Sequence, residues 1–93
     1  GTGADLTGVA GAGEQFKDVP VSQSVIAFGE VGLAGEIRAV SHAMERVKEA
    51  ARLGFQRIIL PRHNMKALTG LSLAGVELIP VRNVREAFEA SLG

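Results

Sequence analysis

The sequence predicts an α/β fold of the α+β type, in which helices pack on a mixed β-sheet. From residue 24 onward, short apolar runs rich in β-branched residues alternate with segments whose apolar residues recur every three or four positions. Strands joined by a helix normally lie parallel in one sheet, whereas strands joined by a tight turn pair antiparallel. With 93 residues, positions 1–93 are expected to form a single domain.

The first 23 residues differ from the rest because they are rich in glycine. GTGADLTGVAGAG carries five glycines, each of which costs about 1 kcal/mol relative to alanine inside a helix. Leu6, Val9 and Ala10 nevertheless keep helical spacing, so we expect a weak helix over residues 4–16 and a connector over 17–23. A phosphate-binding loop in GVAGAG is less favoured, because no apolar strand precedes it and no GKS or GKT follows it.

An antiparallel hairpin and a helix are expected next. SVIAFGEV (24–31) and EIRAV (36–40) are strand-like, and the GLAG between them supplies a tight reversal. Ser41 is predicted to cap a helix over residues 42–53, which ends before Gly54 because a left-handed residue commonly terminates a helix. The helix has an apolar stripe formed by Ala43, Met44, Val47, Ala50 and Ala51.

The remaining elements alternate in the same way. FQRIILP (55–61) and VELIPV (76–81) are predicted strands, and NMKAL (64–68) is a predicted helical turn between them. The last segment is a predicted helix capped by Asn83, with Glu86 three residues later as in a capping box. Its apolar stripe consists of Val84, Ala87, Phe88 and Leu92. We expect Ala43, Val47, Ala50 and residues 58–60 to lie in the core.

Composition restricts the classes of function. Ten Lys plus Arg balance ten Asp plus Glu, which argues against strong nonspecific attraction to nucleic acid or to an anionic membrane. The sequence has no cysteine, so it offers no disulfide or thiolate metal site and is compatible with a reducing cytoplasm. No apolar run approaches the roughly 20 residues that span a bilayer. His42 and His63 lack a metal-ligand spacing, so no metal site is expected.

Basic residues provide the candidate binding site. Arg57, Arg62, His63 and Lys66 are expected to surround the loop at Pro61. Arg82 and Arg85 lie near the last helix, and cations at such a rim contact phosphates. The candidate contacts to duplex DNA are Arg57, Arg62, Lys66 and Arg85; the alternative is an ordinary polar rim.

The runs FGEVGLAGEIRAV, KEAARLGFQRIILP and GVELIPVRNVREAFEASL occur in order over residues 24–92. They resemble the C-terminal domain of the RadA family of bacterial DNA-repair proteins, also called Sms, which is a relative of the proteolytic domain of Lon proteases. Residues 24–93 are the best-matching core, whereas the glycine-rich start, 1–23, departs from the family. A Lon-like domain also normally begins with further strands, so the resemblance implies a fragment truncated at its N-terminal side.

The resemblance also implies that the domain is not a protease. Lon proteases use a Ser–Lys dyad, whose lysine position falls on Met44 and whose serine position falls near Gly3 or Ala4. None of these side chains can serve as a nucleophile or as its base. Lys48 lies one helical turn further, about 5.4 Å away, which is too far for the same role. A Ser–Lys peptidase of the Lon type with a displaced dyad is the alternative function.

The resemblance implies a larger parent protein with a zinc-binding segment and a RecA-like ATPase upstream. Zinc, ATP and magnesium are then expected in those upstream parts, and no cofactor is expected in this fragment. The implied role of the domain is an oligomerisation scaffold in a homo-oligomeric ring, with possible contact to duplex DNA during repair and recombination. The implied location is the cytoplasm, without membrane contact.

Overall fold

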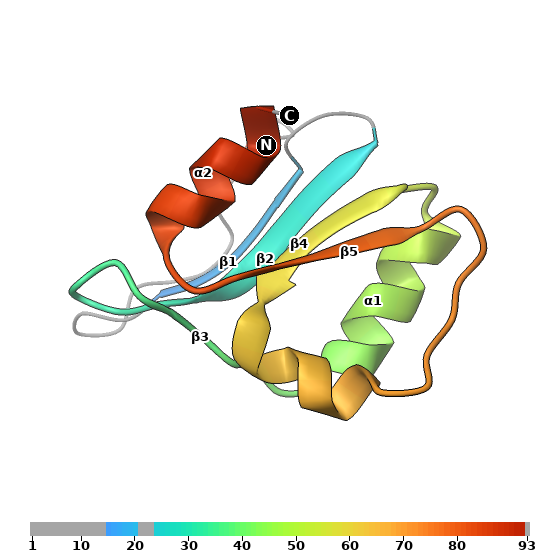
Figure 1. Cartoon of the computed structure of the whole chain (residues 1–93), viewed down its shortest axis with the longest axis horizontal. Helices are drawn as coiled ribbons and strands as arrows, with labels where there is room; N and C mark the ends of the chain where they lie inside the picture. The colour runs from blue at the N-terminus through green and yellow to red at the C-terminus, as the bar shows by residue number, and fades with distance from the viewer. Residues whose placement is uncertain (1–14, 21–23, 93) are drawn as a thin grey trace.

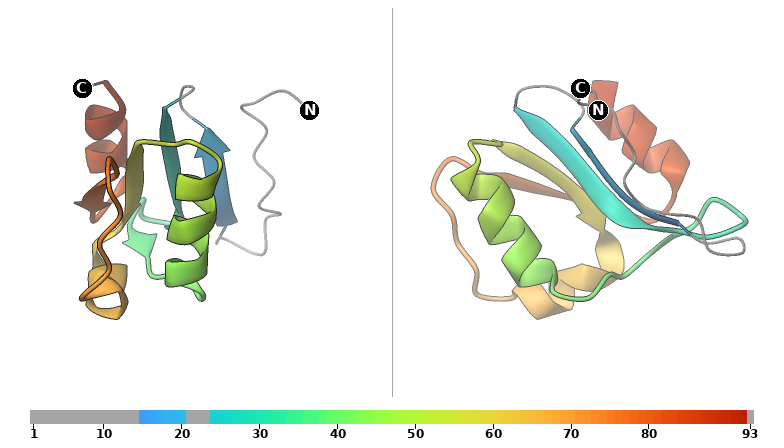
Figure 2. Two further views of the ribbon diagram at one scale, coloured as in Figure 1. Left: turned by 90° about the vertical axis from the view of Figure 1, so that its right-hand side faces the viewer. Right: turned by 180° about the vertical axis from the view of Figure 1, so that it is seen from behind.

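The computed structural model describes residues 15–20 and 24–92. Within these residues the elements occur in the following order: β1 (Gln15–Pro20), β2 (Val25–Val31), β3 (Ile37–Arg38), α1 (Ala43–Arg52), β4 (Arg57–Pro61), η1 (Arg62–Leu68), β5 (Glu77–Val81) and α2 (Val84–Leu92). The η1 element is a 3₁₀ helix. The sheet forms the middle layer, with α1 on one face and α2 on the other (Figures 1 and 2).

In the described part of the chain, one mixed sheet has the strand order β1-β2-β4-β5, and β3 pairs with the end of β2. The neighbours β1 and β3 run antiparallel to β2, whereas β2, β4 and β5 run parallel to one another. The predicted α/β class, the hairpin and the parallel pairing are therefore confirmed. β5 lies at one edge of this sheet, and Pro80 within it is exposed.

The larger part of the core lies between the sheet and α1. Alternate residues of β2 and β4 face this helix, because side chains of a strand alternate between the two faces of its sheet. The buried members of this cluster are Ile26, Phe28, Ala43, Val47, Ala50, Ile58, Leu60 and Leu68. The predicted core residues are thus confirmed on this face, and Ile59 is buried on the other.

The opposite face of the sheet is covered by α2. Val25, Ile59 and Val81 form a second buried cluster together with Ile37. Ala87 and Ala90 of α2 pack against this cluster. Two alanines at the contact allow the helix backbone to approach the sheet closely.

Two glycines are required where they stand. A Cβ on Gly29 would lie 2.7 Å from Cγ2 of Ile37, so only glycine lets β3 and β2 approach each other here. Gly54 has φ +101° directly after α1, the left-handed conformation predicted for the end of this helix.

The prediction for residues 15–23 was wrong where the structure describes them. Gln15–Pro20 form strand β1, paired antiparallel with Ile26–Val31, instead of a helix end and a connector. The polar sequence of this segment does not indicate a strand, and the backbone ladder to β2 supplies the pairing. Positions 1–14 of the predicted weak helix lie outside the described residues, as do 21–23 of the predicted connector.

The predicted start of the central helix was also wrong. His42, not Ser41, is the N-cap of α1; it has φ 60° and makes no side-chain capping hydrogen bond. The Ser41 carbonyl instead accepts a hydrogen bond from Nε of Arg46 at 3.2 Å. In the same region, β3 contains only Ile37–Arg38 of the predicted five-residue strand.

The last helix begins as predicted but faces a different way. The N–H of Glu86 donates to Oδ1 of Asn83 at 2.8 Å, which confirms the cap. Of the predicted apolar stripe, Ala87 packs against the sheet, whereas Val84, Phe88 and Leu92 are 45%, 64% and 72% exposed. The alanines of α2 lie against the sheet instead.

Replacing Val47 by Asp should abolish folding, because Val47 is 0% exposed and a buried, unpaired carboxylate costs several kcal/mol. That cost approaches the whole stability of a small domain, which is about 5–15 kcal/mol. Thermal unfolding followed by circular dichroism would test this. The matched control is Lys48→Asp, which places the same group on the exposed neighbouring residue. A cooperative transition in Val47→Asp at the temperature of the control would contradict the assignment of this face.

Candidate functional site

The carboxyl ends of β4 and β5 lie beside a surface hollow with basic walls. Strand β4 ends at Pro61 and leads directly into η1, while β5 ends at Val81 and leads into Arg82. The hollow has a volume of about 460 Å³, and its lining residues are Arg62, His63, Met65, Lys66, Pro80 and Arg82. We call Arg62, His63, Lys66 and Arg82 the basic edge. Ligands of open α/β sheets commonly bind at this end of parallel strands.

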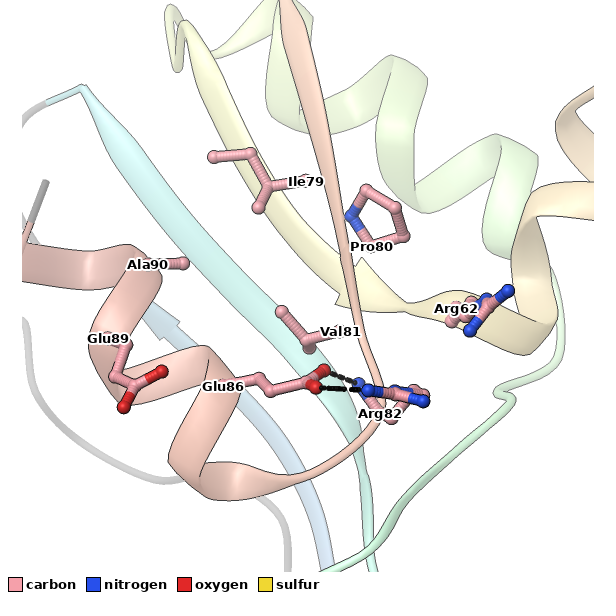
Figure 3. A pocket seen from close by; sticks show the side chains of 8 residues that line it. All are labelled: Arg62, Ile79, Pro80, Val81, Arg82, Glu86, Glu89 and Ala90. Carbon is pink, nitrogen blue, oxygen red and sulfur yellow. Dashed lines mark hydrogen bonds and ion pairs between the residues drawn. The ribbon is translucent and has the colours of Figure 1, made fainter.

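A second hollow of about 640 Å³ lies along β5 and α2 and shares two residues with the basic edge. Arg62 and Arg82 line both hollows. Figure 3 shows the second hollow with Glu86 and Glu89 on α2 and Arg62 on the far side of the β5 ribbon. The second hollow therefore carries carboxylates as well as guanidinium groups, which makes the first hollow the better anion site.

Arg82 is held by Glu86. Its Nη2 and Nε donate to Oε2 of Glu86 at 2.9 and 3.2 Å, and its backbone N–H donates to Oε1 at 2.7 Å. The side-chain hydrogen bond from Arg82 is the largest cause that lowers the pKa of Glu86, and the charge of Arg62 contributes in the same direction. The reciprocal hydrogen bond raises the pKa of Arg82. The charge of Arg82 is thus balanced within the domain.

The other three basic side chains differ from Arg82. Arg62, His63 and Lys66 are exposed, and none of their side chains has a hydrogen-bond or ion-pair partner among residues 24–92. A guanidinium offers five N–H donors and an ammonium three. These donors remain available to an anion, and hydrogen bonds between charged groups are stronger than neutral ones.

Asn64 fixes the turn that carries these side chains. It is 6% exposed, its Oδ1 accepts from the N–H of Val40 at 2.9 Å, and its Nδ2 donates to the Val40 carbonyl at 3.0 Å. Both backbone groups of Val40 are thereby satisfied, and η1 is anchored to the segment before α1. Sequence reasoning missed this role, because a single Asn in a predicted helical turn gives no signal of its burial.

The structure brings together only part of the predicted DNA-contact set. Arg62 and Lys66 line the same hollow. The prediction that Arg57 lies near Pro61 was wrong, because Arg57 starts β4 and Pro61 ends it. Arg57 is half-buried, lies 3.5 Å from Glu77 and donates to the Ala90 carbonyl at 3.4 Å. Arg85 is exposed on α2 and forms an ion pair with Glu89 at 3.4 Å.

The positions predicted for a lost catalytic dyad lie on α1 or outside the described residues. Met44 is half-buried and packs against the core on the α1 side, whereas Lys48 is exposed. Gly3 and Ala4 lie outside the described residues, so the absence of the serine stays a prediction. Residues 24–92 bring no three His, Cys, Asp or Glu side chains together as a metal site.

These features define a small domain in which two helices enclose a mixed sheet and a basic edge lies at the ends of its parallel strands. The sequence model of the family described as "Subunit ChlI of Mg-chelatase" matches residues 1–64. This match covers more than half of the chain, and the chain therefore belongs to that family.

The chain is also similar to curated proteins named DNA repair protein RadA. It is 46% identical to the protein of Bacillus subtilis over 89 residues, which are 96% of this chain and 19% of that protein. It is 45% identical to the Escherichia coli protein over 78 residues, 82% of this chain and 17% of that protein. The protein of Synechocystis is 46% identical over 77 residues, 83% of this chain and 14% of that protein.

The predicted resemblance to the RadA family is confirmed by these relatives. The chain spans less than a fifth of the length of each of the three. Over the described residues, no helix is both long and apolar enough to cross a membrane.

Replacing Asn64 by Ala should destabilise the domain by about 2–4 kcal/mol, because the N–H and C=O of Val40 lose their partner. Urea unfolding would measure the change. His63→Ala is the matched control, since it removes an exposed side chain from the same 3₁₀ helix and should change stability by less than about 0.5 kcal/mol. Equal stability of the two variants would show that the Asn64 contact does not fix η1.

Proposed function

We propose that this domain is a non-proteolytic, C-terminal module of a RadA-type DNA-repair protein and that its basic edge contacts the phosphates of duplex DNA. The names of the relatives support the repair role. The observation that carries the DNA contact is the exposure of Arg62 and Lys66 beside one hollow, with no hydrogen bond or ion pair from either side chain to residues 24–92. By contrast, within the described residues, each of Arg38, Arg52, Arg57, Arg82 and Arg85 lies within ion-pair distance of a carboxylate.

The chemistry of the basic edge suits the DNA backbone better than the bases. A guanidinium binds phosphate oxygens through two parallel hydrogen bonds, and a lysine ammonium acts as a point charge. Contacts to phosphate position a protein on the duplex but carry no sequence information. The contact proposed for Arg62 and Lys66 is therefore independent of base sequence. It is also weak in the isolated chain, whose formal net charge is zero.

Self-association completes the proposal. The resemblance to the Lon proteolytic domain supports a scaffold that holds copies of a larger ATPase together as a ring in the cytoplasm. The zinc, ATP and magnesium sites would then lie in the upstream parts of that larger protein. In this proposal the domain is structural, and its surfaces rather than a reaction centre carry its function.

The alternative is a Ser–Lys peptidase with a displaced dyad. A lysine that acts as a base must be desolvated so that it is neutral near pH 7. Lys48 is exposed on α1, and Met44 occupies the position that faces the core. We expect no serine of the purified chain to be labelled by a fluorophosphonate probe, as read by intact mass. Labelling that is lost in Lys48→Ala would establish the peptidase instead.

The DNA contact predicts a salt-dependent affinity that Lys66 influences and Lys48 does not. Each phosphate contact adds about 0.9 to the magnitude of the slope of log affinity against log salt. Lys66→Ala should reduce this magnitude by about that amount in fluorescence anisotropy with a labelled duplex. Lys48→Ala makes the same change in net charge at an exposed site on α1 and should leave the slope unchanged. Equal slopes for both variants would reject the basic edge as the contact surface.

A further inference from the structure

One side of α2 carries an apolar ridge in solvent, formed by Val84, Phe88 and Leu92. These residues are spaced four apart and are 45%, 64% and 72% exposed. The helix is attached to the sheet by Ala87 and Ala90 on another side. No described residue covers the ridge, and a partner would bury it. Aromatic and aliphatic side chains grouped in this way on a surface mark an interaction site.

The charges beside the ridge indicate what kind of partner fits. Within α2, Arg85 precedes Glu89 by four residues, and the two form an ion pair at 3.4 Å. This order is the less favourable one within a single helix, because cations are stabilised near a helix C-terminus and anions near an N-terminus. In a neighbouring antiparallel helix, the order of these two charges along the contact is reversed. The antiparallel arrangement places each Arg85 near the C-terminal end of the other helix, where a cation is stabilised.

We propose that the occupant of the apolar ridge is α2 of a second copy of this chain, packed antiparallel about a twofold axis. Ridges of residues spaced four apart interdigitate in the commonest class of helix packing. A twofold contact uses the same patch on both copies, so the patch must be self-complementary. The charges of Arg85 and Glu89 are self-complementary only in an antiparallel pair of helices, because a parallel pair would place Arg85 against Arg85 of the other copy. This inference goes beyond the proposed ring, because a twofold contact is closed between two copies and does not continue around a ring.

The size of the ridge sets the strength of the contact. A helix of nine residues is about 14 Å long, at about 1.5 Å per residue. It buries less than the roughly 800 Å² per partner that is typical of stable complexes. Because this area is small, the pair of α2 helices is weak for the isolated chain and forms at high concentration. The turn that carries the exposed Leu33 lies beside the first turn of α2, where the N–H of Val84 donates to the Gly35 carbonyl at 2.9 Å.

The absence of cysteine from the sequence allows a direct test by disulfide trapping. One preparation carries Val84→Cys and the other Leu92→Cys, and both positions are already exposed. In an antiparallel pair Val84 of one copy lies near Leu92 of the other, so the mixed preparations should form a heterodisulfide. A disulfide requires the two Cα atoms to lie within about 7 Å. Oxidation is followed at high protein concentration by non-reducing electrophoresis and intact mass.

The control pair is Ser72→Cys mixed with Leu92→Cys, because Ser72 is an exposed loop residue outside α2. The 84–92 pair should cross-link at least about tenfold faster than the control pair, since docking raises the effective concentration of the two thiols. Adding Phe88→Ser to both partners should remove this advantage. Phe88 is 64% exposed, so its replacement leaves the core intact.

Two results would overturn the inference. The first is a rate for the 84–92 pair equal to that of the control pair, or one that Phe88→Ser does not change. The second is a dominant 84–84 or 92–92 disulfide, which indicates a parallel arrangement. Native mass measured in parallel separates this inference from the proposed scaffold. Oligomers that form without 84–92 trapping would refute the α2 contact and leave the scaffold proposal standing.

Discussion

The structure depends on burial of β4 on both of its faces. Ile58 and Leu60 are fully buried beneath α1, while Ile59 between them is buried beneath α2. The same strand holds β2 on one side and β5 on the other through parallel ladders. Three consecutive apolar residues therefore join both helices and both neighbouring strands, and the two surfaces proposed to be functional are positioned by this strand.

The basic edge and the apolar ridge are both products of this arrangement, and they consist of different residues. The end of β4 delivers Arg62 into η1, and Asn64 ties that turn to Val40 so that its basic side chains project together. The contact of Ala87 and Ala90 with the other face orients α2 and leaves its larger apolar residues outside. One surface is suited to an anion and the other to an apolar partner, so DNA contact and self-association do not compete for the same residues.

The sequence predicted the elements whose signals are local. The apolar runs of β2, β4 and β5, the stripe of α1 and the Asn83 cap all depend on neighbouring residues in the chain. It failed where the outcome depends on tertiary contacts. β1 is stabilised by its ladder to β2, His42 replaces Ser41 as the cap, and the direction of β4 separates Arg57 from Arg62. The sequence did not predict which side of α2 faces the sheet. The space above the sheet is filled by alanines of this helix, and the periodicity of apolar residues does not reveal that.

Pro80 has a consequence for how copies of the domain meet. The N–H of Glu77 points toward β4. The backbone groups of successive strand residues point alternately to the two sides, so those of Pro80, three residues later, point away from the sheet. Pro80 has no N–H, so an incoming strand would lack one hydrogen bond near the C-terminal end of this edge. Ordered addition of strands, the first step toward fibrils, is therefore discouraged along β5. Apolar side chains remain exposed on α2. The domain therefore presents an apolar helix surface to a partner, while its β5 edge resists the addition of strands.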